Sequence, residues 1–206
     1  MHIYEKKLVI TRIFSFFCSL LPLLFWCLVI FSFEEPAAAS LSLLSAIIHE
    51  FGHLGFLFLH KKGSHSFRGV LSGMRIATEN FSSYSDKIMT YLSGPLANFI
   101  VFFISSLLAI RYGNFFAMLA VLNLATAISN LLPIEGYDGY GIICSLIERY
   151  ELPSWALRTL STVSTSLIFF FCLLSLYMID RQGGGYWIFA VFFVSMIKHF
   201  KKSLDK

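Results

Sequence analysis

The chain has 206 residues, of which 57% are hydrophobic and 14% are charged, with 23 phenylalanines and a mean hydropathy of +0.73. This composition excludes a soluble domain and predicts an all-α polytopic membrane protein that forms a single transmembrane domain over residues 1–206. The net charge of +4 does not indicate nucleic-acid binding, because the basic residues lie between apolar runs.

Apolar runs divide the chain into about six predicted transmembrane helices. Their expected bounds are about 13–33, 37–59, 89–110, 115–132, 155–179 and 186–197. The first run ends in Glu34-Glu35-Pro36 without a strong cleavage signature, so it is interpreted as a retained span and not as a signal peptide. The four cysteines lie in or beside these runs without Cys-x-x-Cys spacing, which predicts buried thiols that form neither zinc sites nor disulfides. They are Cys18, Cys27, Cys144 and Cys172.

The second run, 37–59, contains His49-Glu50-Phe51-Gly52-His53, and its only ionisable side chains are the two histidines and the glutamate. On a helix, residues four apart lie on the same face, so both imidazoles can reach one metal ion. Glu50 then projects close by as a general base, the arrangement of a His-Glu-x-x-His metalloprotease. Three ionisable groups within a membrane helix are costly unless paired, and a bound Zn²⁺ is a suitable partner.

The third and fourth spans are joined by a predicted tight turn at residues 111–114, and a long polar loop precedes them. That loop covers residues 60–88, and its 75–78 stretch is a candidate short strand. With six spans and an inner amino terminus, every Lys and Arg except Arg111 and Arg181 lies on the inner side. This bias predicts that both termini face the cytoplasm.

The same topology suggests a third metal ligand. The second and fourth spans both run towards the cytoplasm, so Asp138, which follows the fourth, is expected at a depth similar to that of the histidines. His53 lies eight residues before Lys61 at the inner boundary, which is about 12 Å along a helix. A catalytic zinc takes three protein ligands and keeps one position open, and Asp138 is the strongest candidate for the third.

Three motifs together resemble the site-2 protease family of intramembrane zinc metalloproteases. The first is His49 to His53, the second is Ser93-Gly94-Pro95-Leu96-Ala97-Asn98, and the third is Asn130-Leu131-Leu132-Pro133-Ile134 followed by Asp138-Gly139. Their order and spacing match the family over roughly residues 1–200. The six-span layout is similar to the bacterial branch typified by the stage IV sporulation protein FB, without that branch's carboxy-terminal nucleotide-sensing domain, so control by ATP is not expected.

The resemblance implies that His49, His53 and Asp138 bind one zinc ion and that Glu50 is the catalytic base. It also implies that Asn130 positions the substrate or polarises the scissile carbonyl. Spans two to four are expected to form a three-helix catalytic core, with Gly94, Pro95 and Asn98 shaping the span that faces the site. The loop after span two is expected to be a re-entrant or edge-strand element that holds unwound substrate by strand addition.

Several polar residues have open alternatives. Glu135 departs from the family pattern and is either a competing ligand or a solvated inner-loop charge, and Tyr140 stands where the family has a second glycine. Asn123 either lines the active-site cavity or hydrogen-bonds a neighbouring helix. His60 and His65 are expected in interfacial or solvated positions and not as ligands. The Gly94-Pro95 pair is expected to bend its span, either as a kink without function or with a role towards the substrate.

These observations favour a zinc-dependent intramembrane endopeptidase that cuts transmembrane or membrane-adjacent segments of protein substrates. The alternative is a membrane protein that binds zinc or peptides without cutting. The expected setting is a bacterial cell membrane with the active site near its cytoplasmic side. The expected partners are a membrane-protein substrate, the lipid bilayer and a regulatory membrane protein, with no nucleic acid. Substrate, pathway and oligomeric state are left open.

Overall fold

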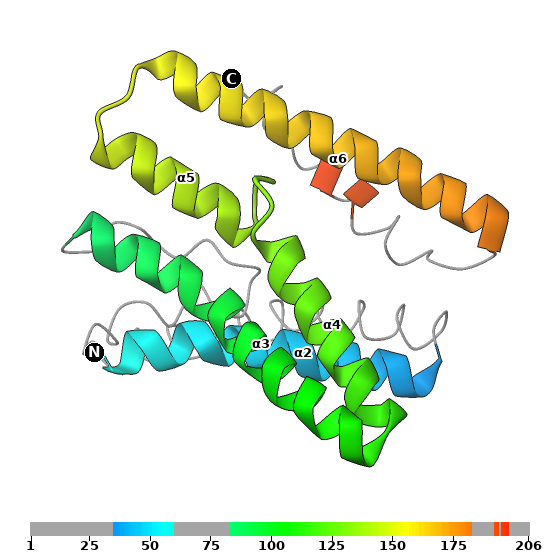
Figure 1. The fold of residues 1–206 in the computed structure, drawn as a ribbon. Coiled ribbons are helices and arrows are strands. Elements are labelled where there is room, and N and C mark those ends of the chain that lie inside the picture. Colours follow the sequence, from blue (N-terminus) through cyan, green and yellow to red (C-terminus); the bar gives the residue numbers. More distant parts are fainter. Residues whose placement is uncertain (1–34, 60–82, 183–191, 194, 198–206) are drawn as a thin grey trace, which may run out of the picture.

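The computed structural model describes residues 35–59, 83–182, 192–193 and 195–197 (Figure 1). All regular secondary structure of these residues is helical. The helices in chain order are α2 (Pro36–Leu59), α3 (Tyr84–Tyr112), α4 (Asn114–Asn130), α5 (Asp138–Arg149) and α6 (Ser154–Gln182). The predicted first span, the 60–82 part of the loop with its candidate strand, and most of the predicted sixth span lie outside the described residues. Cys18, Cys27, His60 and His65 also lie outside them.

Helix α3 begins five residues before the predicted span. Ser83 caps it by accepting a hydrogen bond from the backbone N–H of Ser85 at 3.2 Å, and Asp86 lies in its first turn, where a negative charge is favoured. The helix continues through Pro95 to Tyr112. Gly113 then joins α3 to α4 with φ of 83°, a left-handed conformation that glycine adopts without steric cost. The predicted tight turn at 111–114 is therefore confirmed.

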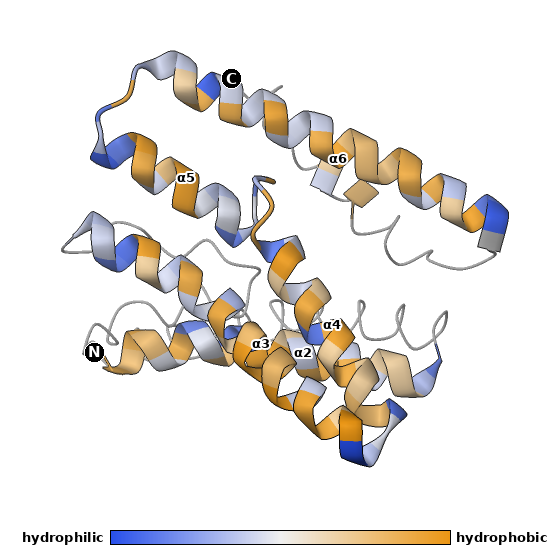
Figure 2. Ribbon diagram, viewed as in Figure 1, coloured by the Kyte–Doolittle hydropathy of each residue, from blue (hydrophilic) through white to orange (hydrophobic). Residues whose placement is uncertain are grey.

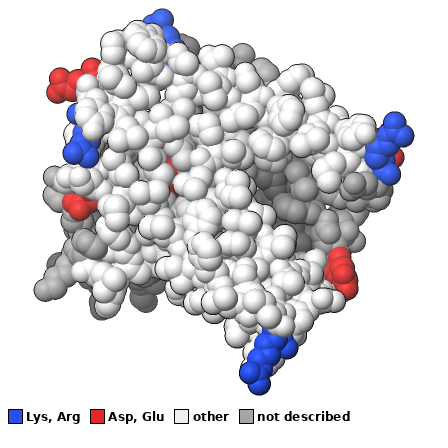
Figure 3. Space-filling view, in the orientation of Figure 1, with Lys and Arg blue, Asp and Glu red and all other residues white. Residues whose placement is uncertain are grey.

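Three helices of the described part are long and apolar enough to cross a membrane, namely Pro36–Leu59, Tyr84–Tyr112 and Ser154–Arg181. Helix α4 is apolar but has only 17 residues. Apolar residues dominate α2, α3, α4 and α6 in Figure 2, and most of the charged side chains visible in Figure 3 lie near the rim of the face shown. The coarse prediction of an all-helical membrane protein is confirmed for the described residues.

The distribution of side chains is that of a helix bundle in lipid, because polar groups lie inside and large apolar groups lie outside. Phe58 is 83% exposed and Ile110 is 85% exposed, whereas many polar side chains are buried. The buried polar side chains on α2, α3 and α4 are Ser45, His49, His53, Lys87, Thr90, Asn98, Ser105 and Asn123. In membranes, such groups hold helices together by hydrogen bonds, since lipid supplies no hydrophobic force between helices.

Helices α2, α3 and α4 pack against one another, and α5 continues along α3 beyond the end of α4 (Figure 1). The α4–α5 path is broken at residues 131–137, where Pro133 cannot continue a helix. Ile134 in this break is fully buried in an apolar cluster with Ile168 and Cys172 of α6. The sequence predicted no helix between its fourth span, 115–132, and its fifth, 155–179, so α5 was missed.

Candidate metal centre

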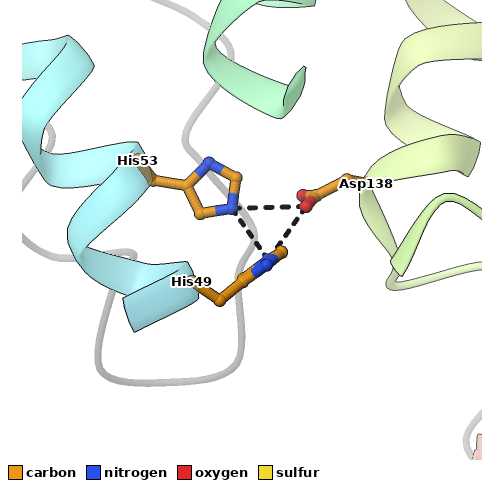
Figure 4. Close-up of side chains that lie close together, drawn as sticks. All are labelled: His49, His53 and Asp138. Atoms are coloured by element: carbon orange, nitrogen blue, oxygen red, sulfur yellow. Dashed lines mark hydrogen bonds and ion pairs between the residues drawn. The ribbon is translucent and has the colours of Figure 1, made fainter. Parts of the chain in front are cut away.

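Two histidines of α2 and one aspartate of α5 meet inside the bundle (Figure 4). His49 and His53 are one helical turn apart, and their Nε2 atoms lie 3.1 Å from each other. Oδ2 of Asp138 lies 3.0 Å from Nε2 of His49 and 3.3 Å from Nε2 of His53. The exposed fractions of these residues are 4%, 0% and 1%. The structure thus brings together the three residues that the sequence predicted as ligands.

The other ring nitrogens of the two histidines are held by oxygen atoms of α3. Nδ1 of His49 lies 2.8 Å from Oδ1 of Asn98, and Nδ1 of His53 lies 2.7 Å from the backbone oxygen of Thr90. A carbonyl oxygen accepts but cannot donate, so each Nδ1 carries the proton. Each Nε2 therefore offers a lone pair, which is the usual arrangement of histidine ligands whose second nitrogen is fixed by an outer hydrogen bond.

The three facing atoms suit a cation between them. With both imidazoles protonated at Nδ1, two lone pairs and the buried Asp138 carboxylate face one another without a proton between them, and a buried charge of this kind needs a partner. Four ligands placed tetrahedrally at about 2.0–2.1 Å from zinc are separated from each other by about 3.3 Å. The observed separations of 3.0–3.3 Å fit this arrangement. The set of two nitrogens and one oxygen also suits zinc and leaves a fourth position open.

Glu50 lies beside the three ligands without being one of them. Its carboxylate interacts electrostatically with His49, His53 and Asp138. Its Oε2 atom is buried and has no hydrogen-bond partner in the described part of the chain. A carboxylate in this position is free to accept a proton from a molecule that enters the site, which is the role predicted for it.

Other candidates do not join the ligand group. Among the described residues, only the ligand atoms of His49, His53 and Asp138 lie close enough together to hold a metal ion, which leaves out Glu135 and both described cysteines. Cys172 is buried as predicted, and Cys144 is half-buried. Burial raises the pKa of the Cys144 thiol, and a protonated thiol is a poor zinc ligand. The Nδ2 group of Asn130 donates to the backbone oxygen of Thr126 at 3.0 Å, and its predicted substrate role remains a prediction.

Gly94 gives the two imidazoles the space they occupy. A Cβ atom at this position would overlap Nε2 of His53 and would lie 2.8 Å from Cε1 of His49. The resemblance predicted that Gly94 shapes the span facing the site, and the structure gives a steric reason. On α2, a Cβ at Gly52 would meet the backbone oxygen of Ser93 at 2.5 Å, so the two helices approach closely here.

We expect Gly94→Ala to weaken zinc binding by about 10–100-fold, because the added methyl group displaces the imidazoles. Overpacking should also lower the free energy of unfolding by about 1–3 kcal/mol. Gly55→Ala is the matched control, since a Cβ at Gly55 meets nothing within 4 Å. Zinc titration and thermal unfolding in detergent micelles measure both effects. Equal zinc affinity in the two variants would contradict the steric role of Gly94.

Helix α5 is fastened to α3 at the end remote from Asp138. Nζ of Lys87 donates to Oε2 of Glu148 at 2.6 Å, and the Lys87 side chain is 11% exposed whereas that of Glu148 is 46% exposed. At the near end, Gly139 allows α5 to approach the backbone of Leu131, because a Cβ there would overlap the Leu131 carbonyl. These two contacts hold α5 at both of its ends.

We expect Glu148→Gln to destabilise the protein more than Lys87→Met does. The first substitution leaves a buried ammonium without its anion, which costs about 1–3 kcal/mol, whereas the second leaves a carboxylate that water can solvate. Thermal unfolding of both single variants and the double variant in micelles tests this order. The double variant should be more stable than Glu148→Gln alone. A larger effect for Lys87→Met would contradict the assignment.

Comparison with protein-family models, curated proteins and solved structures finds no match for this chain. The functional assignment therefore depends on the motifs and on the geometry of the site. Sequence reasoning did not identify Thr90 as a partner of the metal centre, because a backbone carbonyl leaves no trace in residue type. It named Asn98 only as a shaping residue and left the role of Asn123 open between two alternatives.

Proposed function

We propose that this chain is a zinc-dependent endopeptidase that cuts protein segments within or beside the membrane. The observation that supports it best is the buried group of His49, His53 and Asp138 with the carboxylate of Glu50 beside it, whose Oε2 atom has no hydrogen-bond partner among the described residues. These residues lie among apolar helices, and α2 itself is long enough to cross a membrane. A hydrolytic site placed there suits substrates that are themselves embedded in lipid.

The proposed roles of the residues follow from their positions. His49, His53 and Asp138 hold the zinc ion, which would activate a water molecule near neutral pH and polarise the scissile carbonyl. Glu50 accepts the proton of the attacking water and delivers it to the departing amine. Asn130, at the end of α4, is proposed from the family resemblance to donate a hydrogen bond to the developing oxyanion.

A transmembrane helix offers no free carbonyl, because its backbone groups are bonded within the helix. The proposed substrates therefore contain helix-breaking residues near the cut, so that the chain unwinds locally. The loop after α2 is proposed to hold the unwound segment by strand addition. The basic residues favour cytoplasmic termini and a site near the cytoplasmic side of a bacterial cell membrane. Processing of a sporulation factor is one pathway that the resemblance suggests, with a regulatory membrane protein as partner.

The test compares the amino termini of membrane proteins between cells that express the wild-type chain and cells that express Glu50→Gln. New termini found near predicted spans only with the wild type would support intramembrane proteolysis and identify the substrates. Identical profiles, in cells where both proteins are inserted and loaded with zinc, would contradict the proposal.

A second candidate is a membrane protein that binds zinc without cutting. The low exposure of the three ligands favours it, since a peptide reaches them only if the helices separate. A zinc carrier, however, needs polar ligands along a path through the membrane, and the described residues contain a single ligand group. Zinc flux into proteoliposomes separates the candidates, because a protease does not transport the metal.

A further inference from the structure

Four polar side chains on three helices form a buried hydrogen-bonded chain that ends at the metal centre. They are Asn98 of α3, Asn123 of α4, and Ser45 and His49 of α2. All four are at most 4% exposed. None of the roles proposed above for catalysis uses Asn98 or Asn123.

The orientation of the Asn123 amide is determined by a backbone group. Nδ2 of Asn123 donates to the carbonyl oxygen of Leu119 at 2.9 Å, so the Oδ1 atom of Asn123 points at Asn98. Nδ2 of Asn98 donates to this oxygen at 2.9 Å and to the carbonyl oxygen of Ser45 at 3.0 Å. One proton of the Asn98 amide therefore goes to Asn123, and the other is shared between the carbonyl and hydroxyl oxygens of Ser45.

The hydroxyl groups of Thr126 and Ser45 are consistent with this orientation of the Asn98 amide. Thr126 donates to the Leu122 oxygen at 2.8 Å, and Ser45 donates to Oγ1 of Thr126 at 2.8 Å. Because the hydroxyl proton of Ser45 points to Thr126, the Oγ atom of Ser45 acts as an acceptor towards Nδ2 of Asn98, 3.2 Å away. Turning the Asn98 amide around would set its oxygen against the Oδ1 atom of Asn123 and the carbonyl oxygen of Ser45 with no proton between them, at a cost of about 1–3 kcal/mol for each buried unpaired group.

We infer that Asn98 is a positioning residue that fixes the Nδ1 proton of His49, and that Asn123 and Ser45 hold Asn98 in the orientation this requires. Because Oδ1 of Asn98 faces Nδ1 of His49 at 2.8 Å, His49 can present only Nε2 to the metal. The backbone oxygen of Thr90 fixes the Nδ1 proton of His53 in the same way, so His53 also presents Nε2. The inference rests on the metal-binding part of the proposed function and does not require proteolysis.

The test replaces Asn98 with leucine, which is close in size but accepts no hydrogen bond. Zinc affinity, measured by competition with a chelator in micelles, should fall by about 10–100-fold. In the zinc-loaded protein with ¹⁵N-labelled histidine, the Nδ1 proton of His49 should exchange with water faster than in the wild type. The Nδ1 proton of His53 is the internal reference and should stay protected, because its acceptor is a backbone atom.

Two further variants complete the experiment. Asn123→Ala removes only the distant anchor and should weaken zinc binding by less than about 10-fold while also speeding exchange at His49. It decides the question if Asn98→Leu does not fold. Ser175→Ala, in which the lost hydroxyl bonds only to Cys172 of its own helix, is the control and should change neither quantity.

Unchanged zinc affinity and an unchanged exchange rate at His49 in a folded Asn98 or Asn123 variant would overturn the inference. Faster exchange at both histidines would also overturn it, because it would show general loosening of the bundle. Neither readout needs a substrate. A protein that binds zinc as expected but cuts nothing would therefore refute the proposed function and leave this inference intact.

Discussion

Glu50→Gln protein is expected to bind zinc as tightly as the wild type and to lose cleavage by about 10²–10⁴-fold. Glutamine keeps the size of the side chain, and Glu50 is not a member of the ligand group, so the metal centre should be undisturbed. An amide cannot accept the proton of the attacking water at neutral pH, so the reaction loses its general base. Metal analysis and a cleavage assay on purified protein in micelles measure the two quantities.

The control for this variant is Glu35→Gln, at an exposed position just before α2. It should keep both zinc and activity. Full cleavage by Glu50→Gln would refute the role of Glu50 as the base. Loss of zinc together with loss of cleavage would show instead that Glu50 supports the metal.

Asp138→Ala protein is expected to lose zinc affinity by more than about 100-fold, because a direct ligand is worth more than the outer partners whose loss costs 10–100-fold. Its metal-free form should be no less stable than metal-free wild type. The reason is that, with both imidazoles protonated at Nδ1, no proton faces the buried carboxylate of Asp138, and its removal relieves this penalty. Zinc titration and thermal unfolding with and without a chelator measure both effects.

Asp180→Ala is the control, since Asp180 lies exposed near the end of α6. It should bind zinc normally. If metal-free Asp138→Ala were clearly less stable than metal-free wild type, Asp138 would be a structural partner of the two histidines and not primarily a metal ligand.

The helices that face lipid were largely predictable from the sequence. Helix α2 begins at Pro36, one residue before the expected start, and ends at the expected Leu59. Hydropathy identifies such helices because their outer surface is apolar. The start of α3 was placed too late because Lys87 looked like a loop residue. Lys87 forms an ion pair with Glu148, which lies 61 positions further along the chain, and such a pairing cannot be recognised from composition.

Helix α5 was missed for a different reason. It begins Asp138-Gly139-Tyr140-Gly141, and two glycines in the first turn contradict a helix by local propensity. The structure shows what these glycines do, since a Cβ at Gly139 would overlap the Leu131 carbonyl and one at Gly141 would overlap the Tyr91 ring. Close packing against neighbouring residues requires glycine at these two positions, and helix propensity alone does not reveal this requirement.

The ligand group was predicted because its residue types carry chemical information. The spacing of His49 and His53 indicates a metal, and Asp138 was found by topology. The partners that orient the imidazoles were not predicted, because one is a backbone oxygen and the other is Asn98, which was named only as shaping its span. Hydrogen-bond partners of this kind are identified by the distances and directions between atoms, which only the structure supplies.

The separation of the ligands along the chain has a consequence for how the protein is made. His53 and Asp138 are 85 residues apart (138 minus 53). At roughly 5–20 residues per second, a ribosome completes this interval in about 4–17 s. During that time the nascent chain holds His49, His53 and Glu50 but not Asp138. The group of two histidines and one aspartate therefore forms only after α3, α4 and the start of α5 have been made, so the proposed peptidase would be inactive until then.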